Sequence, residues 1–420
     1  MASGTDGRVI VLGIARMADA LGNSFLIVVL PLYIASPNVA GSGFGLTEAL
    51  ITGLVLALFG LASSAAQPIA GRLSDRAGRR KAFVIAGLGL LAVSNFAFSL
   101  TGDYVGLLVI RVLQGIGGAL TITASIALVN EISATENRGS NMGTYNSLRL
   151  VGFGSGPLAA GVVISAGPYT LPIFGELTGF NAAFYIATLS ALVSIALVGV
   201  FVHDPAETTA TTDDLALAIR ARGEGLLDPV FALGIATLFM AMCIALIAPI
   251  EPRINTRLGQ GPTLFGIEFA ALIATLALVQ PLVGRVSDRY GRRTFIIVGL
   301  GLLIPTTVVQ GLVVTPWQMI VARLLQGATA AMVFAPALAL AGDLARSDQS
   351  GAQLSVLTVA FGLGISSGQL ATGYLVRYGF VTPFAFGAVL AAIGVVIVYT
   401  QVEETVLSGE VEGSSPSPTD

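Results

Sequence analysis

Two acidic side chains stand inside long apolar stretches of the sequence, where an ionisable group needs an explanation. Asp19 falls in the apolar run 9–34, and Glu268 falls in the run 264–283. A charge within hydrocarbon is costly and usually marks a path for a proton, an ion or a ligand. Arg111 is the expected partner of Asp19, with Arg16 as a competitor three residues away. The chemistry that these residues suit is reversible protonation, in which a carboxyl group changes its charge with its surroundings.

A structural role is the alternative for each of these residues. Asp19 could form a permanent ion pair with Arg16 or Arg111 that only packs the first run. Glu268 could take a proton, attract a cationic ligand or extend toward the outer surface. The remaining arginines within apolar runs, Arg149 and Arg323, are expected to have structural partners.

Other kinds of chemistry have little basis in the sequence. A single cysteine and a single histidine exclude a disulfide framework and a zinc site, and we expect no metal and no cofactor. The spans contain no phosphate-binding loop and no Ser/His pair, so the chain is not expected to be an enzyme. The net charge of −3, without a basic patch, argues against nucleic acid as a partner.

The elements that must position the charged residues are helices within a lipid bilayer. The 420 residues are 54% hydrophobic and only 11% charged, whereas soluble domains carry about 25% charged residues. Continuous apolar runs of about twenty residues fit membrane helices and are too long for the strands of a barrel. The sequence predicts an all-α membrane protein with twelve spans, the first of them retained, near residues 9–34, 49–70, 82–100, 104–129, 143–166, 181–202, 229–250, 264–283, 294–314, 316–341, 352–375 and 380–401.

The distribution of basic residues predicts the orientation of these spans. With twelve crossings both termini lie on one side. Fourteen lysines and arginines fall in the loops of that side, against three in the loops of the other side, Arg253, Arg257 and Arg377. Because loops rich in Lys and Arg stay in the cytoplasm, we expect both termini to be cytoplasmic.

An internal repeat divides the chain into two halves. The segment QPIAGRLSDRAGRR at residues 67–80 returns as QPLVGRVSDRYGRR at 280–293, with ten of fourteen positions identical. RVLQG at 111–115 similarly returns as RLLQG at 323–327. The repeat predicts two six-helix bundles of the same orientation, 1–202 and 229–402, with the binding site between them. Residues 203–228 form a cytoplasmic linker, part of which could be an amphipathic helix, and 403–420 are expected to be a disordered tail.

Several of these segments resemble motifs of one family. GRLSDRAGRR after the second span, with its echo after the eighth, resembles the signature loop of the major facilitator superfamily. LLVIRVLQGIGGA at 107–119, which contains Arg111, Gln114 and Gly115, resembles the fourth-span motif of proton-coupled members. GFGSGPLAAG at 152–161 resembles the fifth-span motif of drug:proton antiporters, although Ala160–Gly161 stands where a glycine pair is usual. LGNSFLIVVLPLY at 21–33 is similar to the first-span motif of twelve-helix multidrug exporters.

The signature loop and its echo suit a gate at the cytoplasmic mouth. We expect Asp75 to face the positive end of a helix in the other half and Arg79 to pair with Glu131. These pairs should hold the mouth shut and break when it opens. The arginines could instead serve only to set the topology. The residues of the predicted gate are Gly71, Asp75, Arg79 and Glu131, with Gly284, Asp288, Arg292 and Asp343 as their equivalents.

The fifth span carries a small-residue pattern with a proline. Gly152 and Gly156 stand four residues apart on one helix face, Pro157 removes a backbone hydrogen bond, and Gly161 follows. The pattern predicts a close-packed hinge between the halves, although general membrane packing would also use such glycines.

Positions that could line a central cavity are polar or aromatic residues within the spans. The absence of a dense charge cluster there favours a neutral or weakly cationic amphiphile over a highly charged metabolite. An aromatic residue in a span is more often simply packed. The candidate cavity residues are Asn23, Tyr33, Asn146, Arg149, Phe153, Gln280, Gln310, Gln326 and Phe361.

The resemblance and the buried charges together predict a secondary transporter that works by alternating access. We expect proton-coupled efflux of hydrophobic or weakly cationic small molecules by a monomer in the plasma membrane. The alternatives are a uniporter, or a proton symporter or exporter of a metabolite such as a sugar or an amino acid. A membrane sensor with this fold is a further alternative, but neither the linker nor the tail is long enough for a signalling domain.

Overall fold

The computed structural model describes residues 7–41, 43, 45–134, 137–171, 175–204, 226–344 and 350–404. Within these ranges it contains twelve helices long and apolar enough to cross a membrane, as the sequence predicts. Most of the predicted linker and tail, residues 205–225 and 405–420, lies outside the described ranges.

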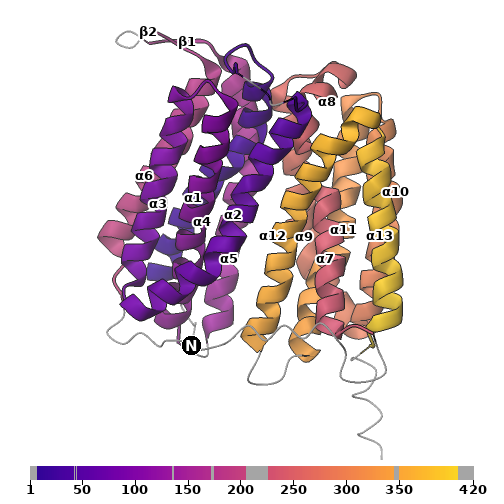
Figure 1. Ribbon diagram of the computed structural model, residues 1–420. Helices are drawn as coiled ribbons and strands as arrows, with labels where there is room; N and C mark the ends of the chain where they lie inside the picture. Colours follow the sequence, from indigo (N-terminus) through magenta and orange to yellow (C-terminus); the bar gives the residue numbers. More distant parts are fainter. Residues whose placement is uncertain are drawn as a thin grey trace, which may run out of the picture.

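The spans are built from these helices in chain order (Figure 1). The first six are α1 (Gly7–Ile34), α2 (Glu48–Ala77), α3 (Arg80–Ala97), α4 (Tyr104–Ile132), α5 (Arg138–Ala166) and α6 (Gly179–Phe201). The second six are α7 (Pro229–Ala245) with α8 (Glu251–Leu258), then α9 (Pro262–Tyr290), α10 (Arg292–Leu312), α11 (Pro316–Leu344), α12 (Ser350–Leu375) and α13 (Thr382–Gln401). A small hairpin of β1 (Tyr169–Leu171) and β2 (Gly175–Leu177) joins α5 to α6, and short 3-10 turns η1 (Phe98–Leu100), η3 (Ala248–Ile250) and η4 (Val376–Tyr378) extend three helices.

Local chemistry explains where several helices begin and end. The side chains of Thr47, Asp103, Thr178 and Asp228 accept backbone hydrogen bonds at the first turns of α2, α4, α6 and α7. The seventh span is broken instead of continuous. A proline ring clashes with the carbonyl four residues earlier, and α7 ends at Ala245, four residues before Pro249. The chain resumes as α8 at Glu251, one residue beyond the predicted end of this span.

The helices form two bundles that stand side by side, α1–α6 and α7–α13 (Figure 1). The β1–β2 hairpin and α8 lie at one end, which we call the hairpin side. We call the opposite end, where α1 begins and α13 ends, the terminal side.

The bundles meet along two equivalent seams. A Cβ added at Gly161 of α5 would touch Thr263 of α9 at 2.7 Å, and one added at Gly266 of α9 would touch Leu158 of α5 at 2.8 Å. The repeat reproduces this contact: a Cβ at Gly373 of α12 would lie 3.0 Å from Leu50 of α2, and one at Gly53 of α2 would lie 2.6 Å from the carbonyl oxygen of Gln369. Only glycine permits so close an approach of two backbones.

The apolar core differs between the two ends. On the hairpin side one continuous cluster, the shared core, contains Phe25 and Leu26 of α1 together with Ile250, Phe265 and Phe384 of the second bundle. Toward the terminal side the described residues form one cluster in each bundle, with Leu88 and Leu128 in the first and Leu233 and Leu340 in the second, and only Ile27 and Phe153 of the first bundle pack against the second cluster. The structure is therefore sealed between the bundles on the hairpin side.

Candidate functional site

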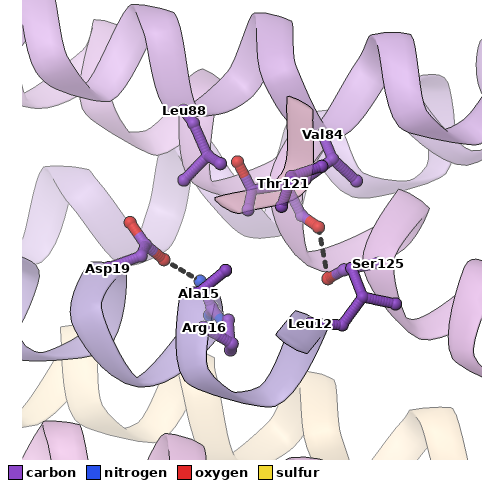
Figure 2. A pocket seen from close by; sticks show the side chains of 9 residues that line it. Leu12, Ala15, Arg16, Asp19, Val84, Leu88, Thr121 and Ser125 are labelled. Carbon is purple, nitrogen blue, oxygen red and sulfur yellow. Dashed lines mark hydrogen bonds and ion pairs between the residues drawn. The ribbon is translucent and has the colours of Figure 1, made fainter. Parts of the chain in front are cut away.

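Asp19 lies beside a small cavity inside the first bundle (Figure 2). Its side chain is 5% exposed and pairs with Arg16, one turn earlier on α1. The cavity has a volume of about 10 Å³, room for about one water molecule. Its walls come from α1, α3, α4 and α6 and are otherwise mostly apolar, lined by Leu12, Ala15, Val84, Leu88, Thr121, Ser125 and Val198.

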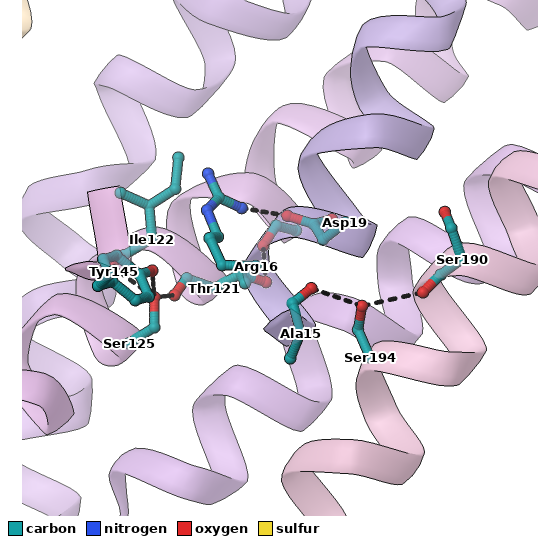
Figure 3. A network of polar contacts seen from close by, with 10 residues as sticks. Ala15, Arg16, Asp19, Thr121, Ile122, Ser125, Tyr145, Ser190 and Ser194 are labelled. Carbon is teal, nitrogen blue, oxygen red and sulfur yellow. Dashed lines mark hydrogen bonds and ion pairs between the residues drawn. The ribbon is translucent and has the colours of Figure 1, made fainter. Parts of the chain in front are cut away.

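Polar side chains tie the helices around this pair together (Figure 3). The hydroxyl groups of Ser125 and Tyr145 lie 2.6 Å apart, and Tyr145 is almost fully buried. Ser194 of α6 donates to the carbonyl of Ala15 at 2.7 Å. Arg149 of α5 is close enough to Arg16 for their charges to repel. Asp19 thus pairs with a local arginine, and a second arginine lies nearby.

Arg111 does not partner Asp19, so that expectation is wrong. It is buried in α4, where its guanidinium donates to the carbonyls of Val55 (2.8 Å) and Leu56 (3.3 Å) in α2 and to Gln114 (3.0 Å). The physical reason is proximity: Arg16 is on the same helix face as Asp19, whereas α4 presents Arg111 to the backbone of α2.

The hydrogen bonds of Arg111 continue across the first bundle. Gln114 donates to Asn95 of α3 at 2.5 Å, and Asn95 donates to the carbonyl of Ala187 in α6 at 3.0 Å. The guanidinium also lies over the ring of Phe59, 5.1 Å from its centroid. This chain of contacts connects α2, α4, α3 and α6. Gly115, the third residue of the motif, lets α4 approach α2, because a Cβ there would lie 2.7 Å from the carbonyl oxygen of Phe59.

Arg323 occupies the equivalent place in the second bundle but is less well satisfied. It donates to Gln326 (2.6 Å) and to the carbonyl of Ile244 (3.3 Å), and Gln326 donates to the carbonyl of Cys243 (3.1 Å). Its Nε and second terminal nitrogen are buried and have no hydrogen-bond partner within the described residues.

Glu268 faces this arginine from α9. The carboxyl group is fully buried, so it does not extend toward the outer surface, and it is close enough to Arg323 to attract it. Neither of its oxygens has a hydrogen-bond partner in the part of the chain that the structure describes. In the repeat Glu268 stands where the first half has Val55, counting back from the aligned Gln67 and Gln280.

The charged residues at the terminal side form two clusters, one in each bundle. In the second bundle Arg292 pairs with Asp288 (2.9 Å) and with Asp343. In the first bundle Arg80, which is 2% exposed, pairs with Asp75 and with Glu131 (2.9 Å). Arg79 was the expected partner of Glu131, and this expectation is wrong because Arg79 is exposed. After the left-handed Gly78, α3 begins at Arg80 and turns that side chain inward.

The clusters also differ from the expected gate in what they connect. The ion pairs of Arg80 with Asp75 and Glu131, and those of Arg292 with Asp288 and Asp343, each join residues of a single bundle. The expectation that these pairs break when the mouth opens stays a prediction. Gly71 and Gly284, the small residues of the predicted gate, have open space where a Cβ would stand.

The glycines of the fifth span serve two different contacts. Cβ atoms at Gly152 and Gly156 would overlap the carbonyls of Met17 and Leu21 in α1, inside the same bundle. The opposite face of the motif meets α9 across the seam: a Cβ at Gly154 would lie 2.9 Å from Ile273, and one at Gly161 would lie 2.7 Å from Thr263. The contact between the halves therefore uses Gly154 and Gly161, because the face with Gly152 and Gly156 is occupied by α1.

The candidate cavity residues fall into two groups. Tyr33 donates to the carbonyl of Thr101 at 2.8 Å and packs on Phe180 and Phe184, and Gln310 and Gln326 are likewise buried inside the second bundle. The side chains of these three are buried in this conformation, Tyr33 within the shared core. The others are half-buried or exposed and remain available: Asn23, Asn146, Arg149, Phe153, Gln280 and Phe361. Among them Phe153 touches Phe269 across the seam, with ring centroids 5.9 Å apart.

The sequence analysis missed two features of this site. Arg80 was overlooked because two adjacent arginines follow each signature glycine, and sequence alone does not say which one points inward. Glu251 was overlooked because it stands just beyond the predicted end of the seventh span. It is fully buried, and no contact of its two oxygens within the described residues has full hydrogen-bond geometry. The prolines at 249 and 252 around it were the available signal of a broken, buried helix.

Two six-helix repeats that meet along small-residue seams, with charged centres buried in each, define a two-bundle membrane transporter. A family model described as Major Facilitator Superfamily matches residues 12–231 and 233–417. The chain belongs to the major facilitator superfamily. Its members are transporters, and the chain is accordingly a multi-pass membrane transporter and not an enzyme.

Individual relatives are more distant. The chain is 26% identical over 189 residues to the quinolone resistance protein NorA of Staphylococcus aureus, covering 45% of this chain and 43% of that protein. It is 29% identical over 142 residues to citrate exporter 1 of Aspergillus niger, covering 34% of this chain and 25% of that protein. The chain thus matches less than half the length of these curated relatives.

Solved structures extend the likeness over the whole fold. A bacterial homologue of the human lysosomal transporter Spinster, in an inward-facing and occupied conformation, has a TM-score of 0.74 at 16% identity, covering 93% of this chain and 95% of that one. The human organic anion transporter MFSD10 has a TM-score of 0.66 at 18% identity, covering 93% and 98%. At such identities the likeness concerns the fold.

Proposed function

We propose that the protein exports hydrophobic or weakly cationic small molecules across the plasma membrane in exchange for protons. The terminal side would face the cytoplasm, in keeping with the fourteen basic residues that the sequence predicts for the loops of that side, and the hairpin side would face outward. The structure then corresponds to a state sealed toward the outside. Cargo would enter between the bundles from the cytoplasm.

The observation that carries this proposal is the environment of Asp19. A carboxyl group within the bilayer, 5% exposed, has one described ion-pair partner, Arg16, and lies beside a cavity of about 10 Å³. A second arginine, Arg149, lies near that partner. Movement of α5 against α1 would change how strongly Arg16 is held by Asp19, and with it the ease of protonating the carboxyl group. This gives a path from helix motion to proton binding.

The relatives support export as the direction of transport. One is named for quinolone resistance and the other for citrate export. The candidate cavity residues that are not fully buried include amide and aromatic groups such as Asn23, Asn146 and Phe153, of which Phe153 meets the other bundle. Such a lining suits an amphiphile better than a highly charged metabolite.

A proton entering the cell is an adequate source of free energy. Across 100 mV it supplies about 2.3 kcal/mol before any pH difference is added. Since about 1.4 kcal/mol corresponds to a factor of ten, one proton per molecule would support about a fifty-fold gradient of a neutral cargo.

Transport in reconstituted liposomes tests this function. The purified protein is given a fluorescent hydrophobic monocation under an imposed pH gradient, with and without a protonophore. We expect accumulation that collapses with the protonophore and fails in Asp19→Asn. Glu176→Gln, an exposed glutamate of β2, is the matched control and should transport normally. Transport that is indifferent to the pH gradient and to Asp19→Asn would identify a facilitator and contradict the proposal.

A further inference from the structure

A second acidic centre, which the proposed role of Asp19 does not use, lies at the sealed hairpin side of the second bundle. Glu251 begins α8 and Glu268 lies in the second turn of α9, and both are fully buried. The two carboxyl groups are close enough to repel each other. The amides of Asn255 and Gln260 are near enough to act as weak donors to Glu251 and Glu268, but no contact of the four carboxyl oxygens within the described residues has full hydrogen-bond geometry.

The fold brings Glu251 into this position through the break in the seventh span. Pro249 ends α7, and Pro252 stands in the first turn of α8. The short helix therefore starts inside the apolar layer, with its first residue pointing among buried neighbours. Ile250, Ile254 and Phe265 are fully buried beside it and belong to the shared core. Water is excluded from the centre in this conformation.

The surrounding helices supply one opposite charge, Arg323 of α11. α7, α12 and the hairpin halves of α1 and α5 contain no Asp, Glu, Lys or Arg, and the charges of α10 stand at its terminal end. On α8 itself Arg253 and Arg257 are exposed and donate to the carbonyls of Val376 and Val313. Tyr33 of α1 donates elsewhere, to Thr101.

The charge balance of the centre then decides its protonation. Arginine keeps its charge in proteins, so two ionised carboxyl groups and Arg323 would leave a net charge of −1 in a dry core. An uncompensated buried charge costs several kcal/mol. One proton on either of the two carboxyl groups makes the centre neutral.

We propose that Glu251 and Glu268 form a two-carboxyl centre that binds a single proton, opposed by Arg323. The proton reaches it from the hairpin side when the shared core opens and is held while that side is sealed. The inference rests on the proposed function only in assuming that the bound proton drives transport. The binding itself can be measured without transport.

Infrared difference spectroscopy of the purified protein in lipid nanodiscs tests this centre. The signal is the carbonyl stretch of a protonated carboxyl group, followed as the pH is raised through neutrality. We expect this centre to contribute one such group in the wild type, and Asp19→Asn identifies any separate contribution of Asp19. Both Glu251→Gln and Glu268→Gln should lose the contribution of the centre, because the remaining carboxylate and Arg323 balance each other. Arg323→Met should show about twice the contribution that the centre makes in the wild type, since two carboxyl groups without a counter-charge must both be protonated.

Several results would overturn the proposal. A signal that survives in Glu268→Gln would assign the proton to Glu251 alone, with Glu268 and Arg323 as a fixed ion pair. A wild-type signal abolished by sodium chloride but not by choline chloride would show that the centre takes a metal cation. Glu176→Gln must match the wild type, and each variant must elute as a single species with an unchanged thermal midpoint, apart from the less stable Arg323→Met. For that variant the doubled signal is the criterion.

The outcomes for the two proposals are separable. If transport proves independent of the pH gradient while the infrared signals follow the pattern above, the proposed exchange is wrong and the proton centre stands. If transport depends on protons and on Asp19 but both glutamine variants keep the signal, the centre is wrong and the proposed function stands.

Discussion

The polar centre of the first bundle and that of the second occupy equivalent places but are built in opposite ways. The Nε and one terminal nitrogen of Arg111 donate to the carbonyls of Val55 and Leu56, whereas the corresponding donors of Arg323 have no partner within the described residues. Where the first bundle has Val55, the second has Glu268, and Glu251 adds another carboxyl group. Arg111 joins α4 to α2 by hydrogen bonds, whereas the charge of Arg323 is opposed by carboxyl groups. The same position of an internal repeat can thus have a structural role in one half and lie beside protonatable groups in the other.

The largest effect should come from removing the two arginines in turn. Arg323→Met leaves two carboxyl groups without a counter-charge, so we expect a loss of about 3–5 kcal/mol of stability near neutral pH. Arg111→Met removes hydrogen bonds but leaves no charge, and should cost about 1–3 kcal/mol.

The pH dependence of the same two variants sharpens this difference. The folded state of Arg323→Met must hold protons that the unfolded state releases near neutral pH, so its stability should rise as the pH falls. Arg111→Met should show no such gain relative to the wild type. Thermal unfolding in detergent at about pH 5 and about pH 8 measures both. Equal pH responses would mean that the two centres do not differ in charge balance.

The charged clusters at the terminal side provide the next comparison. The first bundle uses Arg80, the second arginine after its glycine, whereas the second bundle uses Arg292, the first arginine after its glycine. Arg80→Gln leaves Asp75 and Glu131 without their shared partner, and we expect a loss of about 2–3 kcal/mol. Arg292→Gln should cost less, because its side chain is 15% exposed against 3% for Arg80. The neighbour Arg79→Gln is the matched control and should stay within about 0.5 kcal/mol of the wild type. A larger loss in Arg79→Gln than in Arg80→Gln would contradict the inward position of Arg80.

The seams are where the two halves should behave alike. Gly53→Val and Gly266→Val each place a side chain against the backbone of the other bundle, at a cost of about 1–3 kcal/mol to the sealed state. Spin-label distances across the hairpin side should shift toward a wider separation in both variants. Gly89→Val, whose Cβ would meet open space, should leave the distances unchanged. A shift in only one seam variant would show that the seams are not equivalent.

The smallest effects should come from the carboxylates that cap α3 and α10. Asp204 accepts from the backbone of Lys81 at 2.7 Å, and Glu404 accepts from Arg292 and Arg293 at 3.1 and 2.9 Å. Asp204→Asn and Glu404→Gln should each cost about 0.5–1 kcal/mol, because a neutral amide is a weaker partner for a helix N-terminus. Thermal midpoints measured side by side test this. A loss above about 2 kcal/mol would indicate a role beyond capping.

The sequence was sufficient for the architecture because hydrophobic length and self-similarity are properties of the chain itself. Twelve apolar runs and the 67–80 and 280–293 repeat follow from reading the residues. The hydrogen-bond and ion-pair partners of the charged residues were harder to predict, because they depend on the rotation of each helix about its axis. The choice between Arg16 and Arg111 for Asp19 is set by which face of α4 meets α2. The choice between Arg79 and Arg80 is set by the backbone at one glycine, since Gly78 has φ 61° and Gly291 has φ 99° in otherwise identical GRR segments.

The shared core on the hairpin side has a thermal consequence. Separating the bundles there would bring Phe25, Leu26, Ile250, Phe265 and their neighbours into contact with water. Hydrating apolar surface raises the heat capacity. The equilibrium constant between the state sealed on the hairpin side and the state open there should therefore give a curved rather than a linear van't Hoff plot. Calorimetry on a ligand that traps either state would therefore show how much of this core parts during each cycle.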